Sequence, residues 1–434
     1  MTTDALGLSE PVAPARRTGS LGNLALLSFA LFMATAVAGS MAPLLEAAKH
    51  SMGFSDVQLG LVAGLAAALP TGLLAIPLGR LIDRVSRVRI LFCLALLWSI
   101  GALVTAFAQS FETLFVARML ANLGMFSSVP VGISLAADLC TPDQRGRSVM
   151  LLSLGNKLGG AAAFIITAPL LGLFAVSDQS LLGLEPWRSV QLVFGAASLA
   201  LSLTFLFLRE PARQEIANVS ASTGQALKAV WARRGFLAPL FIGQVGVVMA
   251  DYAAMVWATP VMSRTFHMSE ADSGLYIGLS ILVAGLVGSI IGGVAADWGQ
   301  KARYRGGILV GAVVMALFAI PAALFPVMPN STLALLALGV LLLTGSAAGL
   351  ITATVIAVKV PNEVRGVCLG AFVVAGALVG LGVAPSLVSY GSLVLGGEQH
   401  LSTALAGVGF VINIFSAIAF IIAMLKVPAA ATEA

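Results

Sequence analysis

Three ionisable residues lie deep inside long apolar stretches of this sequence: Asp251, Lys157 and Arg118. An ionisable side chain at mid-membrane depth costs at least about 2.5–3.5 kcal/mol on insertion scales, so each is a functional candidate by default. Asp251 is the only acid deep in any apolar stretch, and a partly buried carboxyl group can exchange a proton or bind a cation. Arg118 and Lys157 offer positive charge to an anionic group of a small molecule.

Polar residues near these charges extend the candidate site. Asn122 lies one helical turn from Arg118 on the same face. By helical spacing we predict further hydrogen-bonding residues at Gln244, Tyr252 and Asn156. Two structural alternatives remain open at this point. Arg118 could reach the membrane interface or pair with Glu112, and Lys157 could form an ion pair with Asp251.

The composition places these residues in a membrane. Of the 434 residues, 59% are apolar and 10% are charged, whereas soluble domains average about 45–50% and about 25%. Apolar runs of roughly 18–25 residues predict transmembrane helices. The runs centre near residues 35, 68, 98, 126, 160, 198, 249, 283, 315, 345, 379 and 412. The sequence therefore predicts an all-α membrane protein with twelve spans.

The distribution of lysine and arginine predicts the orientation. If the N-terminus is cytoplasmic, most of the 24 basic residues fall in cytoplasmic segments. Only Lys49, Arg188 and Arg264 then fall in segments on the outer side of the membrane. Such a bias sets topology, so both termini are expected in the cytoplasm. The first apolar run is too long for a signal-peptide core, so we expect an uncleaved anchor. The basic run at 79–89 is then explained by topology, and no nucleic-acid partner is expected.

The two halves of the sequence repeat each other at an offset of 214 residues. FSDVQLGLVAGL, from Phe54, aligns with MSEADSGLYIGL, from Met268, and the match continues through Asp83 and Asp297 to Arg87 and Lys301. The protein is therefore expected to be a tandem duplication of a six-span unit. Because each unit has an even number of spans, both copies cross the membrane in the same direction. We expect them to be related by an axis along the membrane normal, with a pathway at their interface.

This organisation predicts two bundles with short flanking segments. We expect a cytoplasmic tail at 1–20, a six-helix bundle at 21–208, a cytoplasmic linker at 209–235, a second six-helix bundle at 236–426 and a tail at 427–434.

The loop after the second span resembles the signature loop of the major facilitator superfamily, which reads Gly, three residues, Asp, Arg, one residue, Gly, then Arg and a second basic residue. GRLIDRVSRVR supplies Gly79, Asp83, Arg84 and Arg87, with Ser86 in place of the second glycine. In that family such loops act as a latch between the two halves in one conformation. The resemblance implies that these residues bias the outward-open against the inward-open state, together with Asp297 and Lys301. The alternative is that they only anchor the topology.

Other segments narrow the resemblance. FVARMLANLG resembles the span-4 motif of the superfamily, with Arg118 as its arginine. IPLGRLIDRVSRVR, SLAADLCTPDQRGRS and LREPAR resemble the spinster-like branch. A glutamate usually follows the glycine that Gly124 matches in that branch, and Met125 stands there in this sequence. The implied fold is the twelve-helix major facilitator fold, in which spans 1, 4, 7 and 10 line a central cavity.

These features predict a secondary active transporter that works by alternating access, with protons as the coupling ion. The substrate is expected to be a small organic anion or an anionic amphiphile such as a lysolipid. Efflux of cationic or neutral hydrophobic drugs by proton antiport is the alternative. The sequence shows no catalytic, Walker or metal-binding motif, so we expect no enzyme activity, no cofactor and no metal. A monomer in the bacterial inner membrane, in contact with lipid, is the expected form.

Overall fold

A computed structural model describes residues 21–140, 144–176, 181–211, 228, 230–302, 304, 306–360, 368, 370–372 and 374–428. The predicted tail at 1–20 lies outside the described residues. So do most of the predicted linker and the last six residues of the chain.

The first half contains six membrane-spanning units. The first unit combines α1 (Leu21–Gly39), the short η1 (Ala42–Leu44) and α2 (Leu45–Met52). The second is divided into α3 (Asp56–Ala63) and α4 (Leu65–Arg84). The remaining four are α5 (Arg87–Phe107), α6 (Phe111–Leu139), α7 (Arg145–Val176) and α8 (Pro186–Thr204).

The second half repeats this plan. Its units are α10 (Arg234–Phe266), α11 (Glu270–Lys301), α12 (Gly307–Ala322), α13 (Ser331–Lys359), the π-helical η6 (Gly376–Leu381) that continues into α15 (Gly382–Val394), and α16 (Leu401–Leu425), which the short η7 (Glu398–His400) precedes. The described residues thus contain twelve helices long and apolar enough to cross a membrane. The predicted all-α fold and number of spans are confirmed.

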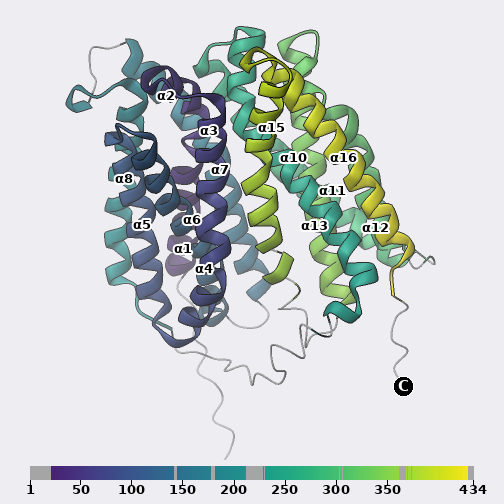
Figure 1. Ribbon diagram of the computed structural model, residues 1–434. Helices are drawn as coiled ribbons and strands as arrows, with labels where there is room; N and C mark the ends of the chain where they lie inside the picture. The colour runs from purple at the N-terminus through teal and green to yellow at the C-terminus, as the bar shows by residue number, and fades with distance from the viewer. Residues whose placement is uncertain are drawn as a thin grey trace, which may run out of the picture.

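Figure 1 shows the two halves as bundles that stand side by side, α1–α8 in purple to teal and α10–α16 in teal to yellow. We call the end at which α1 begins and α16 ends the terminal face, at the bottom of Figure 1, and the opposite end the far face. The chain repeat is visible at the far face, where the second and eighth spans begin. Ser55 caps α3 by accepting a hydrogen bond from the Gln58 amide, and Ser269 caps α11 by accepting one from the Asp272 amide.

Small residues bring the bundles together toward the far face. A Cβ added to Gly60 of α3 would lie 3.1 Å from the Pro385 carbonyl of α15. One added to Gly278 of α11 would lie 3.0 Å from the Ala161 carbonyl of α7. Contacts this close require residues without side chains, as is common between membrane helices.

The same helix faces separate toward the terminal face. A Cβ added to Gly79 of α4 or to Gly370 would meet nothing within 4 Å. Met150 lies two turns before Lys157 on the face of α7 that meets α11, and it is 67% exposed. The space between the bundles is therefore closed at the far face and open at the terminal face.

Candidate functional site

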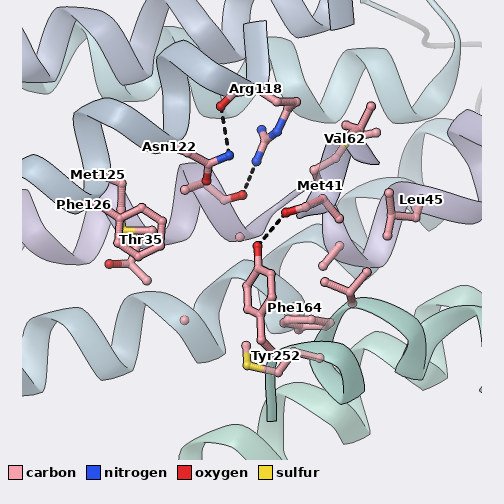
Figure 2. A pocket seen from close by; sticks show the side chains of 17 residues that line it. Thr35, Met41, Leu45, Val62, Arg118, Asn122, Met125, Phe126, Phe164 and Tyr252 are labelled. Carbon is pink, nitrogen blue, oxygen red and sulfur yellow. Dashed lines mark hydrogen bonds between the residues drawn. The ribbon is translucent and has the colours of Figure 1, made fainter. Parts of the chain in front are cut away.

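A cavity of about 130 Å³ lies between the bundles, toward the far face. It is lined by residues of α1, η1, α2, α3, α6 and α7 from the first bundle and of α10 from the second. Figure 2 shows its walls, which are mostly apolar and aromatic. The described lining includes one cation, Arg118, and no acid. Such a pocket suits an apolar ligand body with one anionic group.

Arg118 projects from α6 and is only 3% exposed. One of its terminal nitrogens, Nη2, donates to the carbonyl oxygen of Ala38. That carbonyl lies in the last turn of α1, where backbone acceptors lack intrahelical donors. The other nitrogen, Nη1, is buried without a hydrogen-bond partner among the described residues. Since an unsatisfied charged donor is costly in an apolar site, an anionic ligand would stabilise it.

Asn122 and Tyr252 share this cavity with Arg118. The Asn122 amide donates to the backbone carbonyl of Arg118 at 2.9 Å. Tyr252, on α10, donates its hydroxyl hydrogen to the carbonyl of Ala63 at 2.8 Å, so this bond joins the two bundles. Figure 2 shows Arg118 and Tyr252 reaching toward the cavity from opposite walls.

A break in the second span leaves the Ala63 carbonyl available. Gly64 has φ −90° and ψ −73°, and it separates α3 from α4. In a continuous α-helix the amide of Ala67 would donate to the Ala63 carbonyl, four residues earlier. Here it donates instead to the Gly64 carbonyl, at 3.1 Å, so the Ala63 carbonyl does not receive this hydrogen bond.

The two polar candidates on α7 lie outside the cavity lining. The Asn156 amide donates to the Thr35 hydroxyl at 2.8 Å, and Thr35 itself lines the cavity. Lys157 faces α11, where a Cβ added to Gly285 would lie 4.0 Å from its Nζ. Among the described residues Lys157 has no hydrogen bond or ion pair, and its side chain is exposed in the space between the bundles.

Asp251 and Gln244 face the interior of the second bundle. The Asp251 carboxylate packs directly on Gly345 of α13, where a Cβ would overlap it. A small space beside it is also lined by Thr344 and Asn413. Gln244 accepts a hydrogen bond from the Thr352 hydroxyl at 2.8 Å. The sequence thus predicted one polar group, and the structure divides it into an arginine cavity and a separate carboxylate site.

The ion pair between Lys157 and Asp251, which the sequence left open, is absent from the described structure: each side chain contacts a different helix of the second bundle. The alternative placement of Arg118, at the interface or with Glu112, is also not observed, because Arg118 binds the end of α1.

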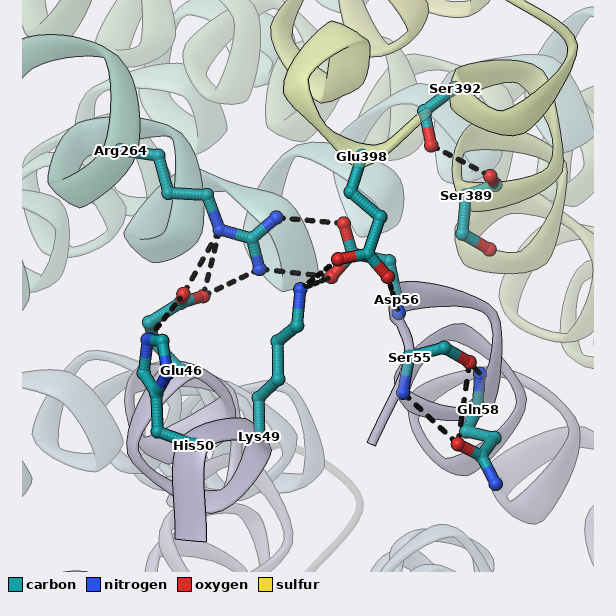
Figure 3. Close-up of polar contacts among 10 residues, drawn as sticks. All are labelled: Glu46, Lys49, His50, Ser55, Asp56, Gln58, Arg264, Ser389, Ser392 and Glu398. Atoms are coloured by element: carbon teal, nitrogen blue, oxygen red, sulfur yellow. Dashed lines mark hydrogen bonds and ion pairs between the residues drawn. The ribbon is translucent and has the colours of Figure 1, made fainter. Parts of the chain in front are cut away.

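An ion network closes the far face, as Figure 3 shows. Arg264 of α10 donates to Glu46 of α2 and to Asp56 of α3, each at 2.7 Å. Lys49 of α2 pairs with Asp56 at 2.7 Å and also with Glu398 of η7. The backbone amide of Asp56 donates to Glu398 at 2.8 Å. The sequence predicts Lys49 and Arg264 on one side of the membrane, but it did not predict their carboxylate partners, which come from three separate segments.

A second ion cluster holds the loop after α4 at the terminal face. Arg87 is 3% exposed, and its guanidinium pairs with Asp138 of α6 and, at 3.0 Å, with Glu210. Glu210 also accepts hydrogen bonds from the Ser86 hydroxyl and the Val88 amide. Partial burial alone would raise the pKa of Glu210, but hydrogen bonds from Val88, Ser86 and Arg87 outweigh it and lower that pKa. These partners of Arg87 were not predicted.

The other loop candidates are placed more simply. Gly79 faces open space and Arg84 is exposed at the end of α4. The side chain of Asp83 lies outside the described residues. Asp297 and Lys301 are exposed on α11 and make no ion pair within the described part of the chain.

Comparison with known proteins identifies the family. The sequence profile described as Major Facilitator Superfamily matches residues 24–385. The chain belongs to the major facilitator superfamily.

The fold is also that of solved superfamily transporters. A bacterial homolog of the human lysosomal transporter Spinster, solved in an inward-facing and unoccupied conformation, superposes with a TM-score of 0.81. It is 21% identical and covers 95% of this chain and 98% of its own. The predicted major facilitator fold is confirmed.

Curated relatives carry transporter names. The "Probable 4-methylmuconolactone transporter" of Cupriavidus pinatubonensis is 28% identical over 78% of each chain. The "Probable sulfoacetate transporter SauU" of Cupriavidus necator is 25% identical over 64% of each chain. The chain is therefore a multi-pass membrane transporter and not an enzyme.

Proposed function

We propose that this superfamily transporter carries a small carboxylate-bearing organic anion by alternating access. The observation that carries the proposal is the unpaired Nη1 of Arg118, buried in a cavity whose described lining holds no acid. An arginine–carboxylate bond in such an environment is charge-assisted and about twice as strong as a neutral hydrogen bond.

The size of the cavity supports a compact substrate. Its volume is about 130 Å³, and engineered apolar cavities of about 150 Å³ bind benzene. One aromatic or alicyclic ring with one carboxylate suits this space better than a lysolipid does. The names of the relatives, 4-methylmuconolactone and sulfoacetate transporters, also favour a small organic solute. A cationic drug would find no counter-charge in the described lining, so the drug-efflux alternative is not proposed.

We assign proton coupling to Asp251. Its carboxylate lies in the middle of a spanning helix, and no described residue donates a hydrogen bond to it. Charge at this depth is expensive, so binding or releasing a proton changes the energy of the conformation that holds the group. Its contact with Gly345 links that change to the packing of α10 on α13.

The terminal face is proposed to be cytoplasmic, as the positive-inside distribution predicts. The conformation described above is then open to the cytoplasm. In the opposite conformation, Asp83 and Arg87 are proposed to approach their repeat equivalents Asp297 and Lys301. Gly79 and Arg84 lie with Asp83 near the end of α4, and the ends of α4 and α11 with their adjoining loops then act as the latch of the closed terminal face.

The substrate class can be tested with benzoate and benzamide, which have nearly the same shape but differ in charge. We expect benzoate, and not benzamide, to raise the melting temperature of the purified protein. Arg118→Gln is expected to weaken benzoate binding at least about tenfold, the loss of one hydrogen bond to a charged group. Arg89→Gln, at an exposed arginine, is the matched control. Equal benzoate affinity in wild type and Arg118→Gln would refute the anion site.

The coupling residue can be tested by benzoate flux in proteoliposomes under an imposed pH gradient. Asp251→Asn is expected to abolish the dependence of flux on the gradient. Gly345→Ala should do the same, because its methyl group would occupy the position of the carboxylate. Glu112→Gln, at an exposed acid, is the control. If Asp251→Asn keeps the gradient dependence of the wild type, the assignment fails.

A further inference from the structure

The short helix α3 is attached to the second bundle at both of its ends, and α10 takes part in both attachments. At the far face, the Asp56 carboxylate binds Arg264 through two hydrogen bonds, 2.7 and 2.9 Å long. At the cavity, the Ala63 carbonyl accepts the hydroxyl hydrogen of Tyr252. The segment between these ends covers the cavity on the side of the far face, since Val62 and Ala63 form part of the lining.

The rest of α3 is built to move as a unit. Gly60 lets it pack closely against α15, because a Cβ added there would lie only 3.1 Å from the carbonyl oxygen of Pro385. The break at Gly64 separates it from α4, so a rotation there does not require bending a continuous helix. The second bundle is also irregular at this level, because Gly64 faces the junction of the π-helical η6 with α15 at Leu381 and Gly382.

The attachment at the cavity depends on one hydrogen atom. A tyrosine hydroxyl has a single hydrogen to donate, and that of Tyr252 is donated to a neutral backbone carbonyl. A carboxylate held by Arg118 in the same cavity would offer it a charged acceptor. Hydrogen bonds to a charged acceptor are shorter and stronger than those to a neutral one.

We propose that Tyr252 is a substrate-sensing gate residue. A substrate carboxylate bound to Arg118 takes the Tyr252 hydroxyl away from the Ala63 carbonyl and so releases the cavity end of α3. Of the two polar attachments of α3, only the ion network at Asp56 then remains, and the far face opens more readily when the cavity is occupied. This inference rests on the proposed anion site, because it requires a carboxylate in the cavity.

The gate can be followed by the distance between spin labels on the far face of each bundle. Gln109, before α6, and Thr332, at the start of α13, are both exposed and lie outside the ion network. The pair Gln109→Cys and Thr332→Cys would be labelled in a Cys93→Ser background, since Cys140 and Cys368 are buried. Distance distributions between the two labels are recorded by double electron–electron resonance in nanodiscs, without ligand, with benzoate and with benzamide.

In the wild type, benzoate is expected to increase the far-open population and benzamide to leave it unchanged. Tyr252→Phe removes the hydroxyl but keeps the ring. It should raise the ratio of far-open to far-closed protein without ligand by about two- to tenfold, the loss of one hydrogen bond, and benzoate should add no further change. Arg118→Gln should keep the closed distribution with and without benzoate. Tyr390→Phe, at a tyrosine 63% exposed, is the control for loss of a hydroxyl.

The two levels of the proposal fail differently. If the wild type shows no benzoate binding by calorimetry, the anion site is refuted. If the wild type binds benzoate but Tyr252→Phe keeps both the ligand-free distribution and the benzoate response of the wild type, the gate role of Tyr252 is refuted and the anion site stands.

Discussion

The second and eighth spans begin with the same sequence pattern and then differ in shape. Each starts after a capping serine, Ser55 or Ser269, and each places glycines at equivalent positions. The eighth span continues as one helix from Glu270 to Lys301, whereas the second is broken at Gly64 after eight residues. The equivalent residue in the eighth span, Gly278, lies within a regular helix.

The partners of the two spans account for this difference. Gly278 packs against α7, a continuous helix whose Ala161 carbonyl lies 3.0 Å from an added Cβ. Gly64 packs against the carbonyls of Leu381 and Gly382, where the opposing helix changes from π to α geometry. π-helical turns often mark functional sites. The two copies of the repeat thus differ in structure. The eighth span is one continuous helix, and the second span is divided at Gly64 into the gate helix α3 and the longer α4.

The largest difference between the copies is expected at their first helical residues. Asp56→Asn removes the carboxylate that joins Arg264 and Lys49, and breaking a buried ion pair costs about 3–5 kcal/mol. Its equivalent Glu270 makes no ion pair with a described residue, so Glu270→Gln is expected to change little. Equilibrium unfolding in mixed micelles would measure both. Equal effects would show that the ion network does not distinguish the two copies.

The loops that follow the two spans should differ next. Arg87 is buried between Asp138 and Glu210, whereas Lys301 is exposed and unpaired within the described part of the chain. Arg87→Gln is expected to lower the free energy of unfolding by about 1.5–3 kcal/mol, as for hydrogen bonds to charged groups. Lys301→Gln should lie within about 0.5 kcal/mol of the wild type, as for ordinary surface substitutions. A large effect at Lys301 would contradict the asymmetry.

A methyl group added at the two equivalent glycines should distinguish the broken second span from the continuous eighth span. At Gly64 it would lie 2.7 Å from the Gly382 carbonyl, which is backbone and cannot turn aside. At Gly278 the nearest atom is a side-chain carbon of Ile165, at 2.6 Å, and the nearest backbone atom, the Ala161 carbonyl oxygen, is more distant at 3.0 Å. We expect Gly64→Ala to cost about 1–3 kcal/mol, as overpacking does, and Gly278→Ala to cost less. The same unfolding measurement decides the order, and a larger cost at Gly278 would overturn it.

The smallest expected effect is a pH dependence confined to the first loop. Because the pKa of Glu210 is lowered in the folded state, its stabilising contribution is present above the ordinary glutamate pKa, about 4.3. It is lost as the pH falls through the lowered value. The difference in melting temperature between wild type and Glu210→Gln should therefore stay nearly constant from pH 7 to pH 5 and shrink as the pH falls below about 4.3. Lys301→Gln should show no such trend, and a difference for Glu210→Gln that stays constant below that pH would contradict the prediction.

Part of the candidate site could be predicted because helical spacing is local. Arg118 and Asn122, four residues apart on one helix, do line the same cavity. The directions of Asp251 and Tyr252 could not be predicted in this way. Successive helical residues point about 100° apart, and only the packing of α10 decides that Tyr252 faces the cavity and Asp251 faces Gly345.

The sequence by itself determined the twelve spans, the duplication and the family. Bilayer thickness sets the length of each apolar run, and the repeat appears as matching residues at one fixed offset in the sequence. Only the tertiary structure decided which charges meet. Glu46, Asp56, Arg264 and Glu398 are brought together by four different segments, and the break at Gly64 depends on the carbonyls of a helix more than 300 residues away in the chain. Such contacts follow from the rotation and tilt of whole helices, which neighbouring helices set.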